Sequence, residues 1–306
     1  MPDTTASAVR NELLRASQRL GGLTTGMVLN LIIATDEAAQ HDAVRSASQA
    51  GREHPCRIIG VVARDPKAAP QLDAEIMVGE DAVQMVVLRS YGELTEHADS
   101  VVAPLLVPDT PVVTWWPGTA PSAPAAARLG TLAQRRITDA AGSADPEETL
   151  ARLAWGYQPG DTDMAWARTT TWRSLLAATL DRPHGDVTEA VVSAEAGNPS
   201  ATLMACWLEG RLGVPASREV SAGPGVTSVT MVTIDGPIRI CRADGRNATL
   251  SRPGEPDRHV ALHRRDTAEL LTEELRRLDP DEVYGEALAM LTADAEAGPA
   301  APVEAG

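Results

Sequence analysis

Two apolar segments separated by one helical segment constrain the fold of this chain more than any other feature. Val28–Thr35 and His54–Ala63 are apolar on both faces, as expected for strands buried inside a parallel sheet. Asp36–Ala50 has helical spacing, and Gly51 follows it. A strand, a helix and a strand in this order pair in parallel through a right-handed crossover. The N-terminal half is therefore predicted to be a sheet covered by helices.

Further segments of this half extend the predicted sheet. Strands Asp73–Val78 and Val83–Ser90 are separated only by Gly79-Glu-Asp, which predicts an antiparallel hairpin. The remaining elements expected here are a helix from Thr4 or Thr5 that ends at Gly21-Gly22, a helix over Glu93–Leu106 and a fifth strand over Val112–Trp116.

The pattern of strands and helices restarts at Asp186. Strand Val187–Ala194 precedes helix Ser200–Leu212, for which Asn198 is a natural N-cap and Pro199 a suitable first residue. The later elements expected are strands Val226–Ile234, Pro237–Arg242, Ala248–Arg252 and His259–His263, and helices Thr267–Leu278 and Asp281–Ala293.

These elements predict an α/β protein with two mixed-sheet domains joined by helices. The expected divisions are an N-terminal domain over 1–145, a helical connection over 146–185, a C-terminal domain over 186–296 and a disordered tail over 297–306. The connection would consist of helices Glu147–Gly156 and Asp163–Leu180.

Composition excludes several classes of function. Lys and Arg number 27 against 42 acids, and the resulting net charge of −15 repels nucleic acid. We find no apolar run of the roughly 18 residues that a membrane span needs, and no signal peptide. The three cysteines are widely spaced, which is typical of a reducing compartment. We expect a cytoplasmic protein.

The Trp115-Trp116 pair is the most distinctive aromatic feature. Neighbouring residues of a strand point to opposite faces, so one ring would face outward if only one face of the strand is buried. An outward indole held by Pro117 could anchor a partner protein or stack on a sugar. The alternative is that the strand is central, with both faces covered.

Two groups of residues are candidates for binding an anion. Asn198 and Ser200 lie at the start of a helix that follows a strand, where backbone amides can bind phosphate. The alternative is simply a well-capped helix. His263 and Arg264, beside His259 and Arg265, could bind a phosphorylated ligand, or else carry surface charge near the acidic C-terminal helices.

Cys56 is the candidate redox residue. His54 and Arg57 could lower the pKa of its thiol and make it reactive, whereas burial among apolar groups would leave it inert. We find no complete dinucleotide fingerprint and no paired metal-ligand or hydrolase motif. We therefore expect no metal and no cofactor.

Four segments together resemble one known family. They are Arg52–Arg57, Pro108–Gly118, Gln134–Asp139 and Gly197–Ser200, and their order and spacing resemble the OpcA family of glucose-6-phosphate dehydrogenase assembly proteins. The resemblance covers nearly the whole chain. It implies a noncatalytic partner that binds the dehydrogenase of the oxidative pentose phosphate pathway, and it supplies no catalytic residues.

The leading hypothesis is an allosteric activator that docks on glucose-6-phosphate dehydrogenase. Trp115, Trp116 and Pro117 would be its anchors, with Arg135 and Arg136 as polar supports. The first alternative is a sugar-phosphate-binding enzyme that uses the Trp pair and the helix start at Asn198. The second is a metabolite-sensing regulator in which ligand binding changes the affinity for the enzyme. Self-association stays open.

Overall fold

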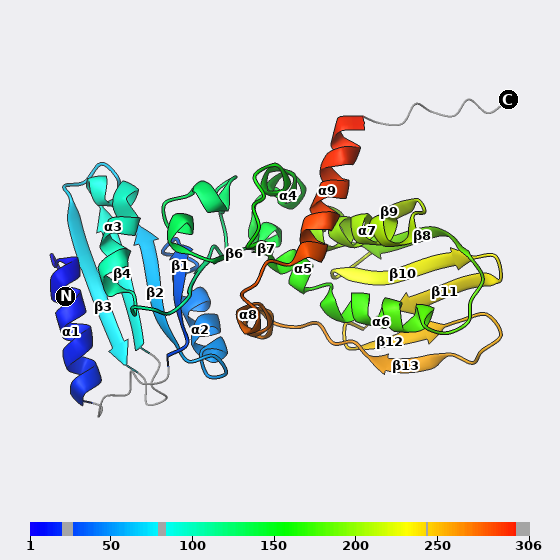
Figure 1. Cartoon of the computed structure of the whole chain (residues 1–306), viewed down its shortest axis with the longest axis horizontal. Coiled ribbons are helices and arrows are strands. Elements are labelled where there is room, and N and C mark those ends of the chain that lie inside the picture. Colours follow the sequence, from blue (N-terminus) through cyan, green and yellow to red (C-terminus); the bar gives the residue numbers. More distant parts are fainter. Residues whose placement is uncertain (20–26, 79–83, 243, 298–306) are drawn as a thin grey trace. The chain divides into compact units, whose positions relative to one another are not determined.

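The computed structural model describes residues 1–19, 27–78, 84–242 and 244–297. They form two compact units, each built on its own sheet (Figure 1). The first unit contains Met1–Gly142, Gly160–Met164 and Asp266–Pro280, and the second contains Ser143–Pro159, Ala165–Arg265 and the chain from Asp281. The expected α/β class with two mixed sheets is confirmed.

The first sheet has seven strands. In their order across the sheet they are β3 (Gln71–Val78), β4 (Gln84–Tyr91), β2 (Cys56–Ala63), β1 (Leu29–Thr35), β5 (Val112–Trp115), β6 (Arg135–Thr138) and β7 (Asp161–Asp163). Only β3 and β4 pair antiparallel, and their neighbours pair in parallel. Both the parallel β1–β2 pair and the antiparallel β3–β4 pair confirm the prediction. The turn predicted at Gly79-Glu-Asp and the helix end at Gly21-Gly22 lie outside the described residues.

Helices of the first unit are α1 (Ala6–Arg19), α2 (Gln40–Ala50), α3 (Ala98–Val102) and α8 (Thr267–Arg276). The single helix expected over Glu93–Leu106 is instead α3 between two 3₁₀ turns, η1 (Gly92–His97) and η2 (Ala103–Leu105). Pro104 lies in the second turn, and a proline lacks the N–H that a continuing α-helix would need. Further 3₁₀ turns are η3 (Pro124–Ala126), η4 (Gly130–Leu132) and η5 (Ala140–Gly142).

The second sheet has six strands. In order they are β13 (Arg258–Ala261), β12 (Asn247–Ser251), β11 (Gly236–Cys241), β10 (Val226–Thr233), β8 (Val187–Ala194) and β9 (Ala216–Val220). All neighbours pair antiparallel except β8 and β9, which are joined in parallel through α7 (Pro199–Leu212). Strand β9 escapes the sequence prediction because its residues lack apolar alternation, and four of its five residues are exposed.

The remaining helices of the second unit are α4 (Pro146–Trp155), α5 (Met164–Ala167), α6 (Thr170–Leu180) and α9 (Glu282–Ala297). The long helix expected over Asp163–Leu180 is interrupted between α5 and α6. There Thr169 Oγ1 donates to the Trp166 carbonyl, a local bond that competes with helix continuation. The helices α4 and α6, and α5 from Ala165 onward, were expected as a connection but belong to the second unit, whereas α8 belongs to the first. The tail expected from 297 lies outside the described residues beyond Ala297.

The second sheet is covered by helices on one face. Alternate residues of its strands, including Val192, Val229 and Ile240, share one core cluster with Trp172 of α6 and Met204 of α7. The intervening residues, such as Val191, Thr230 and Arg239, are half-buried or exposed. An antiparallel sheet tolerates a face of this kind because its side chains alternate between core and surface.

Candidate functional site

Both rings of the tryptophan pair are buried. Trp115 is 1% exposed and Trp116 is 6% exposed. Strand β5 lies between β1 and β6, so neighbouring strands and the layers on both faces enclose it. The expectation of an outward indole is therefore wrong, and the alternative of a central strand is the one that the structure has. Pro117, the proposed third anchor, is only partly exposed, and a β-carbon on Gly142 would lie 2.8 Å from its carbonyl oxygen.

Arg135 and Arg136 lie inside the first unit, so their expected role as surface supports is wrong. Arg135 forms an ion pair with Glu274 of α8, in which both side chains are at least nine-tenths buried, and donates to the Asp279 carbonyl at 2.9 Å. Arg136 pairs with Asp161 of β7 and donates to the Ala133 carbonyl. These guanidinium groups connect β6 to α8 and to β7 and are not available to a partner.

Asn198 caps helix α7 as predicted, with its side-chain oxygen 3.1 Å from the Ala201 amide. Its amide nitrogen donates to Glu195 Oε1 at 3.0 Å, and Ser200 is 5% exposed. The adjacent hollow, of about 500 Å³, is lined by Glu147, Glu195 and Glu219 with a single arginine, Arg218. Arg218 already binds Glu147 and Thr202. Three carboxylates around one paired arginine repel an anion, so the well-capped helix is the better interpretation.

The structure does not bring His263 and Arg264 to that hollow. Both side chains are exposed, and neither residue lines it. The Arg264 guanidinium lies against Gly225, and the Arg264 amide donates to the Gly245 carbonyl at 2.9 Å. The two groups predicted as candidates for anion binding are therefore separate features of the surface.

The environment of Cys56 is the opposite of the one that a reactive thiol needs. Burial raises the pKa of the thiol from an ordinary 9.0 to about 12. Arg57 directs its guanidinium to Gln84 and to the Leu105 carbonyl, and His54 Nε2 lies 3.1 Å from the Thr272 carbonyl. Both groups that could have lowered the thiol pKa are engaged elsewhere, so the expected redox role is wrong.

We expect Cys56 to resist alkylation in the folded protein. A pKa of about 12 instead of 9.0 makes the thiolate fraction near neutral pH about a thousandfold smaller. Iodoacetamide labelling at pH 8, followed by mass spectrometry of the peptide with Cys56, should give rapid labelling in urea and almost none without it. Equal rates in both states would contradict this. Because only the unfolded thiol ionises between pH 9 and about 12, its contribution to stability falls across that range.

At the carboxyl end of β1, acidic residues stand where a dinucleotide-binding fold places its glycine-rich turn. Asp36 Oδ1 accepts the Ala39 amide at 2.8 Å, immediately before α2. Glu37 forms ion pairs with Arg64 at 2.9 Å and Arg89 at 3.6 Å. Asp36 thus caps the turn before α2, and the paired carboxylate of Glu37 follows it in the chain.

Exposed aromatic surface is found on the second unit instead. Trp155, the last residue of α4, is 60% exposed. Helix α4 packs against α9 and α7, with Leu150 and Leu153 buried. The stripe formed by Leu150, Leu153 and Ala154 was visible in the sequence. Trp155 lies outside this stripe, so it is not on the buried face of the helix. The position of Trp155 relative to the stripe was the sequence signal that could have identified the exposed ring.

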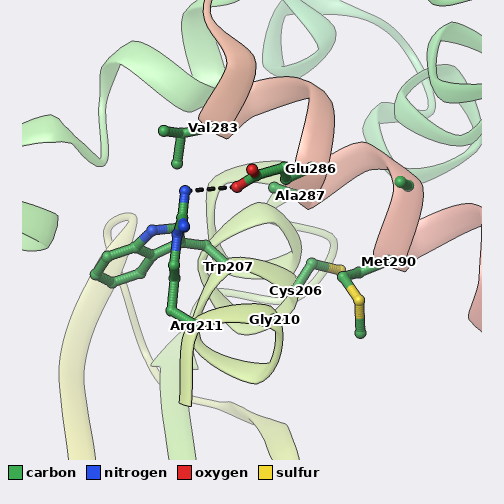
Figure 2. A pocket seen from close by; sticks show the side chains of 9 residues that line it. Cys206, Trp207, Gly210, Arg211, Val283, Glu286, Ala287 and Met290 are labelled. Carbon is green, nitrogen blue, oxygen red and sulfur yellow. Dashed lines mark hydrogen bonds and ion pairs between the residues drawn. The ribbon is translucent and has the colours of Figure 1, made fainter. Parts of the chain in front are cut away.

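A pocket of about 340 Å³ lies between α7 and α9 (Figure 2). The helices approach closely at Gly210, where a β-carbon would lie 3.4 Å from Met290 Cγ. Trp207 and Arg211 both line the pocket, and Arg211 forms an ion pair with Glu286, drawn as a dashed line in Figure 2. The remaining lining residues are Cys206, Val283, Ala287 and Ala289. The lining of this pocket is mostly apolar, with Arg211 and Glu286 as its charged members.

Two absences hold for the described part of the chain. No group of three His, Cys, Asp or Glu side chains there is placed to hold a metal ion. None of the described helices combines the length and apolarity that crossing a bilayer requires.

Two consecutive parts of the chain match one protein family. Residues 47–155 match the N-terminal domain of the glucose-6-phosphate dehydrogenase subunit, and residues 159–288 match its C-terminal domain. A relative from Synechocystis, described as a putative OxPP cycle protein OpcA, is 27% identical over 204 residues. The match includes 60% of this chain and 42% of that protein, so the chain spans about two fifths of the length of this relative.

Among solved structures, two oxidoreductases are similar at low identity. A 3-ketoreductase from Actinomadura kijaniata has 11% identity and a TM-score of 0.48, over 85% of this chain and 94% of that one. An oxidoreductase from Sinorhizobium meliloti has 12% identity and the same TM-score, over 87% of both chains. Similarity at this level supports no functional argument.

Proposed function

We propose that this chain, which belongs to the OpcA family of glucose-6-phosphate dehydrogenase subunits, is a noncatalytic cytoplasmic protein that binds the dehydrogenase and favours its assembled, active form. The observation that carries the proposal is the succession of both family domains along one chain, which takes in most of the two units. The sequence resemblance in four separate segments supports the same conclusion.

Activation of this kind requires binding energy and no bond-making chemistry. A partner that binds only the assembled state of an enzyme stabilises that state by RT ln(1 + [L]/Kd), about 2.7 kcal/mol at a hundredfold excess over Kd. A shift of that size changes the ratio of assembled to dissociated enzyme about a hundredfold. Allosteric activation is thus a consequence of selective binding.

We place the enzyme contact on the helical side of the second unit, around Trp155. Binding energy at protein interfaces concentrates in a few large residues, and Trp is among the most enriched of them. Trp155 is the only tryptophan more than a third exposed in the described part of the chain. The surface therefore offers an indole anchor, although not at the position that the sequence suggested.

Replacing Trp155 with Ala should weaken binding to the dehydrogenase about thirtyfold, which corresponds to a hot spot of about 2 kcal/mol. Stability should stay within about 0.5 kcal/mol, because the side chain is largely solvated. Biolayer interferometry against immobilised dehydrogenase measures the effect. Ile234→Ala is the matched control, since Ile234 is 70% exposed in the same unit and lies in the turn between β10 and β11.

The outcomes of this experiment separate two claims. If the unmodified chain binds the dehydrogenase and Trp155→Ala binds equally well, the role of Trp155 as the anchor is contradicted. The proposed function is then unaffected. No binding by the unmodified chain would contradict the proposed function itself.

The rival sugar-phosphate hypothesis loses its supports in this structure. The Trp pair is buried, and the hollow beside Asn198 is acidic. Neither feature is available to stack on a sugar ring or to bind a phosphate group.

A further inference from the structure

The face of the second sheet that points away from the helical core has an uncharged central band. Cross-strand register places one set of alternate residues on this face, and Ser228 Oγ donates to Ser193 Oγ across it. All members of the band except Ser228 remain partly exposed, so no other described element seals the face. The band consists of Val191, Ser193, Ser228, Thr230, Val232, Cys241, Thr249 and Ser251.

Charges on this face are sorted by side. Glu189 of β8 lies opposite Val232, and Glu219 of β9 lies opposite Ser193, so the β8–β9 side is acidic. On the β11–β13 side, Arg239 of β11 lies opposite Thr230 and carries a positive charge, and the imidazole of His259 of β13 lies opposite Thr249. All four side chains are exposed. Within the described residues, Glu189, Glu219 and Arg239 have no ion-pair partner.

We propose that this sheet face binds the same face of a second copy of the chain. In a two-fold interface each patch meets its own equivalent, so the face must be complementary to itself. A two-fold axis along β10 sets the β8–β9 side of one copy over the β11–β13 side of the other. Glu189 and Arg239 are on the strands that flank β10, level with Val232 and Thr230, so each then lies across the interface two residues along the strand from the other.

The size and shape of the face suit such packing. Two sheets stack about 10 Å apart. Ser, Thr, Val and Cys side chains are short enough to fill that space, and the central band has no long side chain that would have to move aside. Six strands about 4.8 Å apart give a width of about 24 Å. With strands of eight residues at its centre, the face approaches the roughly 800 Å² per partner of a standard interface.

Net charge opposes this association, and the local pairs offset it. Two copies at −15 each repel one another at long range. At physiological ionic strength this repulsion is screened beyond about 8 Å, whereas ion pairs at the contact lie within that distance. The dimer should therefore be observed near 0.15 M salt and weaken when salt is removed.

Sedimentation equilibrium of the full chain tests the proposal. The unmodified protein should show a mass of twice 32.2 kDa at micromolar concentration. Arg239→Glu and Glu189→Arg should each raise the dissociation constant at least tenfold, and the double exchange should restore it to within about threefold. Arg10→Glu is the matched control, because it makes the same charge change on α1 in the first unit.

A second readout needs no variant. Cys241 lies in the central band and is half-buried in one copy. Its alkylation rate should fall as protein concentration rises through the dissociation constant.

A monomer at all concentrations would overturn the proposal, as would a double exchange that does not restore the dimer. If the chain is monomeric and the same variants lose the dehydrogenase, the face belongs to the enzyme instead. If the dimer forms but no dehydrogenase binds, the proposed function fails while this inference stands.

Discussion

Replacing Arg135 with Ala is expected to lower the free energy of unfolding of the first unit by about 3–5 kcal/mol. The change leaves the Glu274 carboxylate, whose side chain is 7% exposed, without its cation. It also removes the bond from Arg135 to the Asp279 carbonyl, which follows α8. An uncompensated buried charge costs far more than the intact pair contributes, so the effect should exceed that of any surface substitution.

Urea unfolding followed by pulsed hydrogen exchange measures this effect, because peptides of each unit are read separately. The matched control is Arg135→Met with Glu274→Leu, which removes both charges and keeps similar volume. This double variant should be neutral or more stable by about 1–4 kcal/mol. A single variant as stable as the parent would show that the pair is solvated and would contradict the buried network.

Replacing Trp115 with Ala should destabilise the first unit by about 3–5 kcal/mol and leave dehydrogenase binding intact once the protein is folded. The indole is 1% exposed in the centre of the sheet, so its removal leaves a cavity that the neighbouring strands cannot close. Low temperature or a stabilising osmolyte keeps the variant folded for the binding measurement.

Trp155→Ala provides the opposite case, since that indole is 60% exposed. One substitution should affect stability and the other should affect binding. If fully folded Trp115→Ala protein bound the dehydrogenase more weakly than the unmodified chain, that result would contradict the buried position of the pair.

The proposed enzyme contact and the proposed dimer contact use opposite sides of the second sheet. Helix α7 packs on β8 and β9, and α9 and α4 pack on α7, so Trp155 belongs to the helical side. The uncharged band lies on the other side. A dimer of this kind would present two enzyme-binding surfaces, and such bivalence would raise the effective concentration of the second dehydrogenase subunit. This consequence depends on the proposed function.

Features with strong local chemistry could be predicted from the sequence. The unit β1–α2–β2 could be predicted because both strands are apolar on both faces and are separated by one helix. A strand, a helix and a strand in this order pair in parallel through a right-handed crossover. The start of α7 was visible because Asn198 and Pro199 satisfy the needs of a first helical turn. Each of these predictions depends on residues that are close in sequence.

Features that depend on strand order could not be predicted. Alternation predicts opposite faces for Trp115 and Trp116, but the position of their strand inside the sheet depends on β6 and β7, which extend the sheet beyond it. Those strands have only four and three residues, too few for a periodic signal. Arginine in the sequence RRIT is typical of a surface, and only Glu274, 139 residues further along the chain, makes Arg135 a core residue.

The candidate site was misplaced for the same reason. The Trp115-Trp116 pair is conspicuous in the sequence and was therefore chosen as the anchor. Trp155 can be identified as exposed only from its position outside the apolar stripe of α4. Cys56 shows the limit of reasoning from neighbours in sequence. The adjacent Arg57 is near in the chain, but its guanidinium binds Gln84, and burial decides the thiol pKa.

The most direct test is to titrate the purified chain into glucose-6-phosphate dehydrogenase while recording complex mass and the substrate saturation curve together. We predict a saturable complex that contains both proteins, a larger fraction of assembled enzyme, and higher activity at subsaturating glucose 6-phosphate. Dehydrogenase that keeps the same mass and the same curve at a hundredfold excess of the chain would contradict the proposed role.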